Sequence, residues 1–261
     1  MNADDIPFTL RLAKDARDLR AAQRLRYRVF VQELGGSGPL VDHDAQIEQD
    51  EFDPYFDHLL LIDPRRDAEA LEDVVGVYRL LPSDRLALSG RFYSESEYDL
   101  TALKTSGRRL LELGRSCVHP DYRGGTAMFH LWNALAEYVL DRQIEVLFGV
   151  ASFHGTNIAA LAQPLAYLHH HHLAPAALRV VARPEHALAM DLIPIEKLDR
   201  KAALAGTPAL IKAYLRLGGF VGQGAWLDHA FNTTDVCLVM DTEKMSAKHR
   251  EFYLRKQARE A

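Results

Sequence analysis

The chain has 261 residues, 48% of them hydrophobic, and a formal net charge of −5 at pH 7. This suffices for a full hydrophobic core, and the presence of only two cysteines argues against a disulfide framework and suits a reducing compartment. The acidic balance gives no reason to expect a nucleic-acid partner, and neither a signal peptide nor an apolar stretch of the roughly 20 residues that span a bilayer is present, so we expect a cytoplasmic protein.

A strand, a helix and an acidic segment come first. Residues 9–13 alternate apolar and polar side chains, which predicts a strand, and Asp15 then caps a helix that runs to about residue 32. The Gly- and Pro-rich residues 35–39 end this helix. Residues 41–57 hold seven carboxylates and no Lys or Arg. This segment is either a solvated loop or an electrostatic lure for a cationic substrate.

A hairpin follows the acidic segment. The apolar runs at residues 58–63 and 74–81 predict an antiparallel pair of strands around a turn at residues 64–67. Residues 90–107 are polar, and we expect a small helix or loop there.

The next segments form a strand–loop–helix–strand unit. Residues 110–118 predict a strand, residues 119–125 a loop, residues 126–142 an amphipathic helix and residues 146–151 a further strand. Residues 155–261 alternate helix and strand more loosely. Because no linker or internal repeat divides the chain, we expect one α/β domain over residues 1–261.

The loop of this unit has the pattern of a phosphate site. Gly124 and Gly125 stand where a strand feeds the beginning of a helix, and free backbone N–H groups at such a place attract a phosphate. The loop suits the pyrophosphate of coenzyme A or the single phosphate of phosphopantetheine. A plain turn gives the same pattern.

Residues 110–125 with the following helix resemble the acyl-carrier motif of the GNAT N-acyltransferases. The resemblance implies a mixed sheet flanked by helices, and a bulge, which we place at Gly114, that splays this strand from the next. Such a bulge could turn Glu112 and Arg115 toward one site. Thr126 stands where GNAT loops have a third small residue, which disfavours the coenzyme A diphosphate.

Four segments occur in the order and spacing of acyl-homoserine lactone synthases: residues 26–30, 50–53, 76–82 and 112–115. Those enzymes draw acyl groups from acyl carrier protein. Four of the matching residues could form a lattice of ion pairs: Asp50, Asp53, Arg79 and Arg115. Such a lattice would either hold the acidic segment over the active cleft or only support the scaffold. The resemblance implies an active cleft that contains Arg26, Phe30, Asp50, Asp53, Arg79, Glu112 and Arg115.

The C-terminal half narrows the resemblance. Residues 149–156, 210–218 and 231–236 resemble the ornithine N-acyltransferases of bacterial aminolipid synthesis, with a C-terminal extension that lactone synthases lack. The resemblance implies transfer of a 3-hydroxyacyl group from acyl carrier protein to the α-amine of ornithine, giving lyso-ornithine lipid, with no cofactor besides the acyl-phosphopantetheine thioester. Glutamine or another amino acid as acceptor, lactone synthesis, and an inactive carrier-binding relative remain alternatives.

Glu112 is the candidate base for this reaction, directly or through water, and Arg115 the second catalytic candidate. Backbone N–H groups near Gly114 would stabilise the oxyanion. The binding candidates in the strand and loop are Gly114, Ser116, Cys117, Arg123, Gly124 and Gly125. A basic patch for the acidic carrier is expected from Arg108, Arg109, Arg123 and Arg142.

Three other patterns are given no chemical role. Residues 58–63 fit the His-x4-Asp pattern of glycerolipid O-acyltransferases but lack its partner block, and no His–Asp pair is in register to activate Ser116 or Cys117. The histidines at 169–172 point in different directions on a helix, so we expect no metal site.

The C-terminal tail has cationic residues beside aromatic ones. Residues 244–260 hold six Lys or Arg and two Glu around Phe252 and Tyr253. This is either an interfacial helix in peripheral contact with the inner membrane or an ordinary solvated helix.

Overall fold

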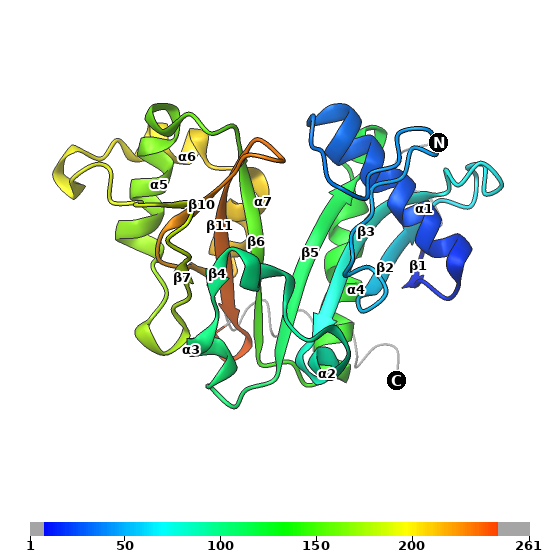
Figure 1. Cartoon of the computed structure of the whole chain (residues 1–261), viewed down its shortest axis with the longest axis horizontal. Coiled ribbons are helices and arrows are strands. Elements are labelled where there is room, and N and C mark those ends of the chain that lie inside the picture. The colour runs from blue at the N-terminus through cyan, green and yellow to red at the C-terminus, as the bar shows by residue number, and fades with distance from the viewer. Residues whose placement is uncertain (1–7, 245–261) are drawn as a thin grey trace. The chain divides into compact units, whose positions relative to one another are not determined.

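The computed structural model describes residues 8–244, and the chain divides into two compact units. The first unit holds residues 8–89 and Leu113–Gln143, and the second holds Gly90–Glu112 and residues 144–244. Strand β5 (Leu110–Val118) begins in the second unit and ends in the first (Figure 1). The single domain over residues 1–261 stays a prediction, and the tail beyond residue 244 lies outside the described residues.

The first unit is a sheet with a helix on each face. Strand β1 pairs antiparallel with β2, β2 pairs antiparallel with β3, and β3 neighbours β5. Its elements besides β5 are β1 (Thr9–Leu12), α1 (Ala16–Arg26), a π-helix (Tyr27–Glu33), β2 (Asp57–Ile62), β3 (Val74–Pro82), a 3₁₀ turn (Ser83–Arg85), α2 (Leu86–Ser89), a second 3₁₀ turn (Pro120–Tyr122) and α4 (Ala127–Asp141).

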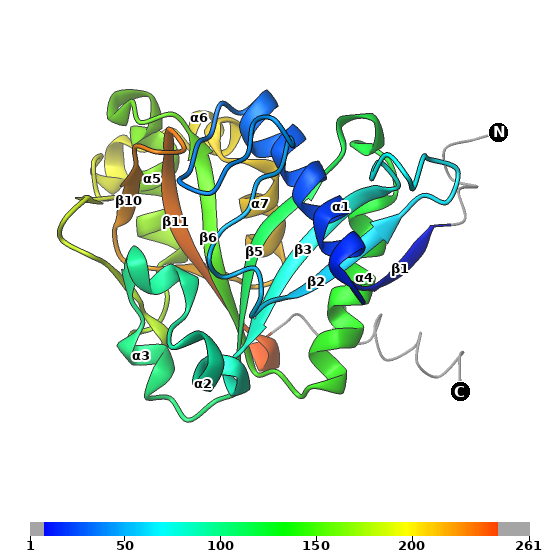
Figure 2. The same cartoon turned by 45° about the vertical axis from the view of Figure 1, so that its right-hand side comes forward.

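Every residue of β3 is buried because α1 covers one face of the sheet and α4 the other (Figure 2). Val77 and Leu60 belong to the core cluster formed with α1. Gly76 faces α4, where an added Cβ would lie 2.8 Å from Leu131 Cδ1. Glycine is therefore required at residue 76 for the helix to approach the strand this closely.

Helix α1 begins at the predicted cap, Asp15, whose side chain accepts a hydrogen bond from the Asp18 N–H at 2.9 Å. The sequence predicts a regular helix to about residue 32. The structure instead widens into the π-helix Tyr27–Glu33, after which the Leu34 N–H donates to the Val29 carbonyl, five residues back. The wider turn changes which side chains share a face.

The second unit is built on a long antiparallel ladder between β6 and β11 (Figure 1). Strand β5 adds Leu110–Glu112 in parallel to β6, β10 and β8 follow β11, and β9 also pairs β11. The elements are a 3₁₀ turn (Tyr93–Ser96), β4 (Tyr98–Asp99), α3 (Thr101–Lys104), β6 (Val146–His154), α5 (Ile158–His172), η6 (Ala176–Leu178), β7 (Val181–Ala182), β8 (Ala187–Leu188), η7 (Ile195–Lys197), α6 (Arg200–Gly206), α7 (Ala209–Arg216), β9 (Phe220–Val221), β10 (Ala225–Asp228), β11 (Thr233–Asp241) and η8 (Thr242–Lys244).

Part of the core of the second unit lies where residues 90–107, the segment predicted to be polar, contact the sheet. Phe92 packs edge-on against Phe148 of β6, with ring centroids 4.9 Å apart, and both are buried. Strands β4 and β7 form a separate two-stranded sheet. Across residues 8–244, none of the helices combines the length and the apolar character needed to cross a bilayer.

Candidate active site

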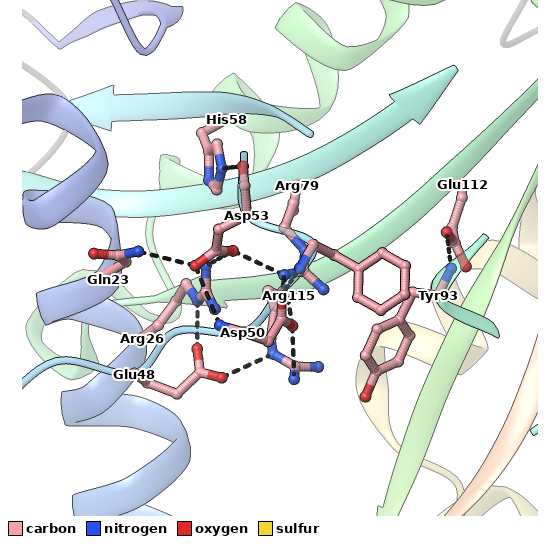
Figure 3. Close-up of polar contacts among 11 residues, drawn as sticks. Gln23, Arg26, Glu48, Asp50, Asp53, His58, Arg79, Tyr93, Glu112 and Arg115 are labelled. Carbon is pink, nitrogen blue, oxygen red and sulfur yellow. Dashed lines mark hydrogen bonds and ion pairs between the residues drawn. The ribbon is translucent and has the colours of Figure 1, made fainter. Parts of the chain in front are cut away.

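A lattice of buried charges joins α1 to the acidic segment in the first unit (Figure 3). Arg26 donates to Glu48 Oε2 at 2.5 Å and to Asp53 Oδ1 at 2.6 Å. Gln23, one helical turn earlier, donates to Asp53 Oδ2 at 2.9 Å. Arg26 is 0% exposed and Glu48 1% exposed. Burial has therefore removed the hydration of these charged groups. The cost of this desolvation is tolerable only because each charge has an ion-pair partner.

Strands β3 and β5 complete the lattice. Arg79 Nη1 donates to the two oxygens of Asp50 at 2.6 and 2.7 Å and to Asp53 Oδ1 at 2.8 Å. Arg115 donates to Glu48 Oε1 at 3.2 Å and to Asp50 Oδ2 at 3.3 Å. The structure thus brings together the four residues expected to form ion pairs. Sequence reasoning missed Glu48 as a member, although it stands in the same acidic segment.

The lattice holds three guanidinium groups and three carboxylates, so its formal charges cancel. Burial would raise the pKa of Glu48, but the charges of Arg26 and Arg115 outweigh it and hold that pKa at about 2. For Asp53, burial is likewise outweighed by Arg26 and Arg79, and its pKa lies well below the ordinary range. Both carboxyl groups are therefore ionised at neutral pH.

Pairing also changes the acidic segment. Besides the three lattice carboxylates, Asp57 pairs with Arg85 at 2.8 Å and accepts the hydroxyl of Tyr138 at 2.8 Å. Four of the seven carboxylates in residues 41–57 thus pair with arginines of the unit. The interpretation of this segment as a lure for cations rests on the other three, which are exposed.

The backbone of β5 is left-handed at Arg115, one residue after Gly114, where we expected the bulge; the bulge itself stays a prediction. Arg115 has a φ of +46°, in the left-handed region that costs a non-glycine residue about 1–2 kcal/mol. In this conformation its side chain reaches Glu48 and Asp50. A Cβ added at Gly114 would lie 3.7 Å from Arg79 Nε, which is ordinary contact.

Glu112 lies on the part of β5 that belongs to the second unit and is 1% exposed. Its carboxylate accepts a hydrogen bond from the Tyr93 N–H at 2.8 Å (Figure 3). It also accepts from the Ser94 N–H at 2.7 Å and from the Ser94 hydroxyl at 2.5 Å. A carboxylate has about four acceptor positions, and these donors use three of them. Glu112 therefore holds the start of the 93–96 turn in place, and its role as a base stays a prediction.

A hollow of about 480 Å³ opens at the predicted phosphate loop in the first unit. Gly124 has a φ of +78°, which favours glycine, and Gly125 follows it in the lining. Thr126 is the N-cap of α4 but makes no side-chain capping bond, so its hydroxyl does not occupy the first N–H groups of the helix. The loop thus presents the backbone donors that a phosphate requires.

Two arginines that sequence reasoning missed line the same hollow. Arg65 and Arg66 lie in the turn between β2 and β3, which the sequence indicated only as a turn. Arg65 forms a two-point ion pair with Asp63 at 2.9 and 2.7 Å, and the Tyr122 hydroxyl donates to Asp63 at 2.6 Å. Hydrogen bonding by Arg65 lowers the pKa of Asp63 well below its usual range. The buried Asp63 carboxylate thus ties the turn to the loop.

One of the four arginines expected to form a basic patch lines this hollow, and the patch itself stays a prediction. Of its four arginines, Arg123 lines the hollow, where it pairs with Glu33 at 2.5 and 2.7 Å. Arg142 follows the far end of α4, whose 15 residues place it on the order of 20 Å away. The other two, Arg108 and Arg109, belong to the second unit.

The remaining predicted site residues face the interior. Phe30 lies in the π-helix, is partly buried and packs against the core cluster that contains Cys117. Burial raises the pKa of the Cys117 thiol to about 12, which removes it as a nucleophile at neutral pH. The Ser116 hydroxyl is buried and has no hydrogen-bond partner among the described residues.

His58, which the sequence analysis gave no chemical role, has a structural contact. His58 Nε2 lies 3.0 Å from the Asp53 carbonyl, and burial lowers the pKa of His58. It does not pair with Asp63, which is occupied by Arg65 and Tyr122. In the chain from 8 to 244, the one group with a donor set for a metal ion is Glu97, Asp228 and Asp235. Acidic groups gather in this way without an ion, and we assign it no role.

Comparison with known proteins places the chain. The Acetyltransferase (GNAT) domain family matches residues 25–133. The chain is 65% identical over 256 residues to an L-ornithine N(alpha)-acyltransferase of Rhodobacter capsulatus, covering 98% of each. The chain belongs to the L-ornithine N(alpha)-acyltransferase family. A second member, from Brucella abortus, is 42% identical over 94% of this chain and 88% of its own length.

A solved structure shares the fold of this chain. FeeM, an N-acyl amino acid synthase from uncultured soil microbes, superposes with a TM-score of 0.51 at 12% identity, covering 91% of this chain and 92% of its own. The predicted GNAT-type α/β fold and the resemblance to ornithine N-acyltransferases are confirmed.

Proposed function

We propose that this chain is an N-acyltransferase that joins a fatty acyl group to the α-amine of L-ornithine and so forms lyso-ornithine lipid. The observation that carries the proposal is the 65% identity to the Rhodobacter capsulatus L-ornithine N(alpha)-acyltransferase over 98% of both chains. The match of the GNAT domain to residues 25–133, which include the lattice and the phosphate loop, supports acyl transfer.

Amine chemistry favours the α position. An amine must be neutral to attack a thioester, and an α-amino group ordinarily loses its proton about two pH units below a side-chain amine. The free carboxylate of ornithine narrows this difference without removing its direction. Attack then gives a tetrahedral oxyanion and expels the carrier thiol, so no covalent intermediate on the protein is required.

Two lattice members are the candidates for holding the acceptor. The side chains of Asp50 and Arg115 are 18% and 15% exposed, whereas those of the other four are 3% exposed or less. An amino acid offers an ammonium group to a carboxylate and a carboxylate to a guanidinium. We assign Asp50 the first contact and Arg115 the second, and Glu112 the role of base.

The donor we propose is an acyl carrier protein. Its arm carries a single phosphate, whereas coenzyme A presents a diphosphate. The loop has Thr126 in place of a third small residue, which supports binding of the single phosphate rather than the diphosphate. No cofactor besides the acyl-phosphopantetheine thioester is needed.

An assay with purified components tests both parts. The protein is incubated with 3-hydroxyacyl carrier protein and either ornithine, glutamine or no acceptor, and the products are identified by mass spectrometry. We expect the mass of 3-hydroxyacyl-ornithine in the ornithine sample and at least tenfold lower yield with glutamine. A kcat/KM for 3-hydroxyacyl-coenzyme A equal to that for 3-hydroxyacyl carrier protein would overturn the donor assignment. Absence of the ornithine product would overturn the function.

The product also implies delivery to a bilayer. Each buried methylene contributes about 0.8 kcal/mol, so a long acyl chain leaves slowly into water. We propose that the chain makes peripheral contact with the inner membrane through residues 244–259, which lie beyond the described part of the structure except for the first. Truncation after residue 243 is expected to abolish binding to anionic vesicles while turnover in solution persists. Unchanged vesicle binding would contradict this.

A further inference from the structure

The hollow at the phosphate loop has a wall made of side chains as well as one made of backbone. The backbone wall comes from Gly124, Gly125 and the start of α4. The other wall comes from Arg65 and Arg66 of the β2–β3 turn, which are distant in sequence from the loop. Their side chains are 49% and 20% exposed, so both reach solvent at the hollow.

We infer that Arg65 and Arg66 bind the phosphate of the thioester carrier's arm together with the backbone N–H groups of the loop. This inference rests on the proposed function, because it names the part of the donor that this hollow holds. A loop with Thr126 at the third position can wrap an anion less closely. Two guanidinium groups compensate, since each forms charge-assisted hydrogen bonds with a phosphate.

Both arginines are held in place and still have donors to spare. The pair with Asp63 uses two N–H groups of Arg65, and a guanidinium carries five. Arg66 donates through Nε to the Glu72 carbonyl at 2.8 Å and through Nη2 to its carboxylate at 3.2 Å. Its guanidinium carbon also lies 6.0 Å from the centre of the Tyr122 ring. The remaining N–H groups are able to meet an anion in the hollow.

Asp63 is the positioning residue of this arrangement. It accepts from both Arg65 and the Tyr122 hydroxyl, so the turn and the loop are fixed against one carboxylate that is 1% exposed. The two walls of the hollow therefore keep a fixed spacing. Such preorganisation limits the ordering that binding must bring about.

The test compares 4′-phosphopantetheine with pantetheine, which differ by the phosphate, in titration calorimetry on the full-length protein. The wild type is expected to bind the phosphorylated arm at least tenfold more tightly. In Arg66→Gln and in Arg65→Gln we expect the ratio of the Kd for pantetheine to the Kd for 4′-phosphopantetheine to fall by about 10- to 100-fold, or to one. This is the effect expected when one hydrogen bond between charged groups is lost. Arg66→Gln is the primary variant because its partner Glu72 is itself 39% exposed, so folding is preserved.

Arg17→Gln is the matched control. Arg17 also pairs bidentately with a buried carboxylate of the first unit, Asp73, at 3.0 and 2.5 Å, but it does not line the hollow. It is expected to keep the wild-type preference. The inference is overturned if wild type shows no preference for the phosphate, if both hollow variants keep it, or if Arg17→Gln loses it equally. Because the readout is binding, failure of ornithine acylation would leave this result intact.

Discussion

Replacing Asp53 by Asn removes one negative charge from the centre of the lattice without changing the size of the side chain. Arg26 and Arg79 then share fewer carboxylates than they need, and their side chains are 0% and 1% exposed, so water does not replace the lost partner. Asp53 Oδ2 also becomes an amide nitrogen, which no longer accepts from Gln23. Removing one partner of a buried pair costs roughly 3–5 kcal/mol, and we expect a loss of free energy of unfolding in that range.

The assay is urea unfolding followed by fluorescence. The chain has two tryptophans, Trp132 in the first unit and Trp226 in the second, so a Trp226→Phe background makes the signal report on the unit that holds the lattice. Asp44→Asn is the control because Asp44 is exposed in the same acidic segment, and its effect is expected within about 0.5 kcal/mol. A loss below about 1 kcal/mol for Asp53→Asn would refute the argument that these charges depend on one another.

Three further outcomes follow from the structure. The pKa of Glu48 is about 2 in the folded protein against an ordinary 4.5, so the stabilisation from its ionised form is present above pH 4.5 and is lost as the pH falls toward 2. We expect Glu48→Gln to flatten that part of the curve of unfolding free energy against pH. Parallel curves for wild type and variant would contradict this. Cys117 and Cys237 are buried with raised pKa values, so a thiol reagent at pH 8 should label neither until urea is added, and rapid labelling of the native protein would show that the core is open. If Glu112 is the base, Glu112→Gln should lower kcat by about 10²–10⁴-fold with an unchanged circular-dichroism spectrum, whereas near wild-type turnover would leave it only the role of holding Tyr93 and Ser94.

The regular elements around the phosphate loop were predictable because their patterns are local. Strand β5 (Leu110–Val118) has the predicted bounds, and α4 (Ala127–Asp141) lies within one residue of them at each end. The π-helix at Tyr27–Glu33 was not predictable, since its hydrogen bonds follow from packing and not from the spacing of apolar residues.

The site shows the same division. Motif resemblance identified Asp50, Asp53, Arg79 and Arg115, which the structure does join. Glu48 was missed because membership of a buried lattice depends on which carboxylates a loop turns inward. The arginines of the β2–β3 turn were missed because a turn between two strands carries no signal of what lies across from it in space.

Isotope labelling shows which nitrogen of ornithine the chain acylates. Ornithine labelled with ¹⁵N at the α position is incubated with the purified protein and 3-hydroxyacyl carrier protein, and the amide of the product is located by tandem mass spectrometry. We expect the acyl fragment to retain ¹⁵N in its amide. An unlabelled amide, formed at the side-chain nitrogen, or no acylated ornithine would contradict it.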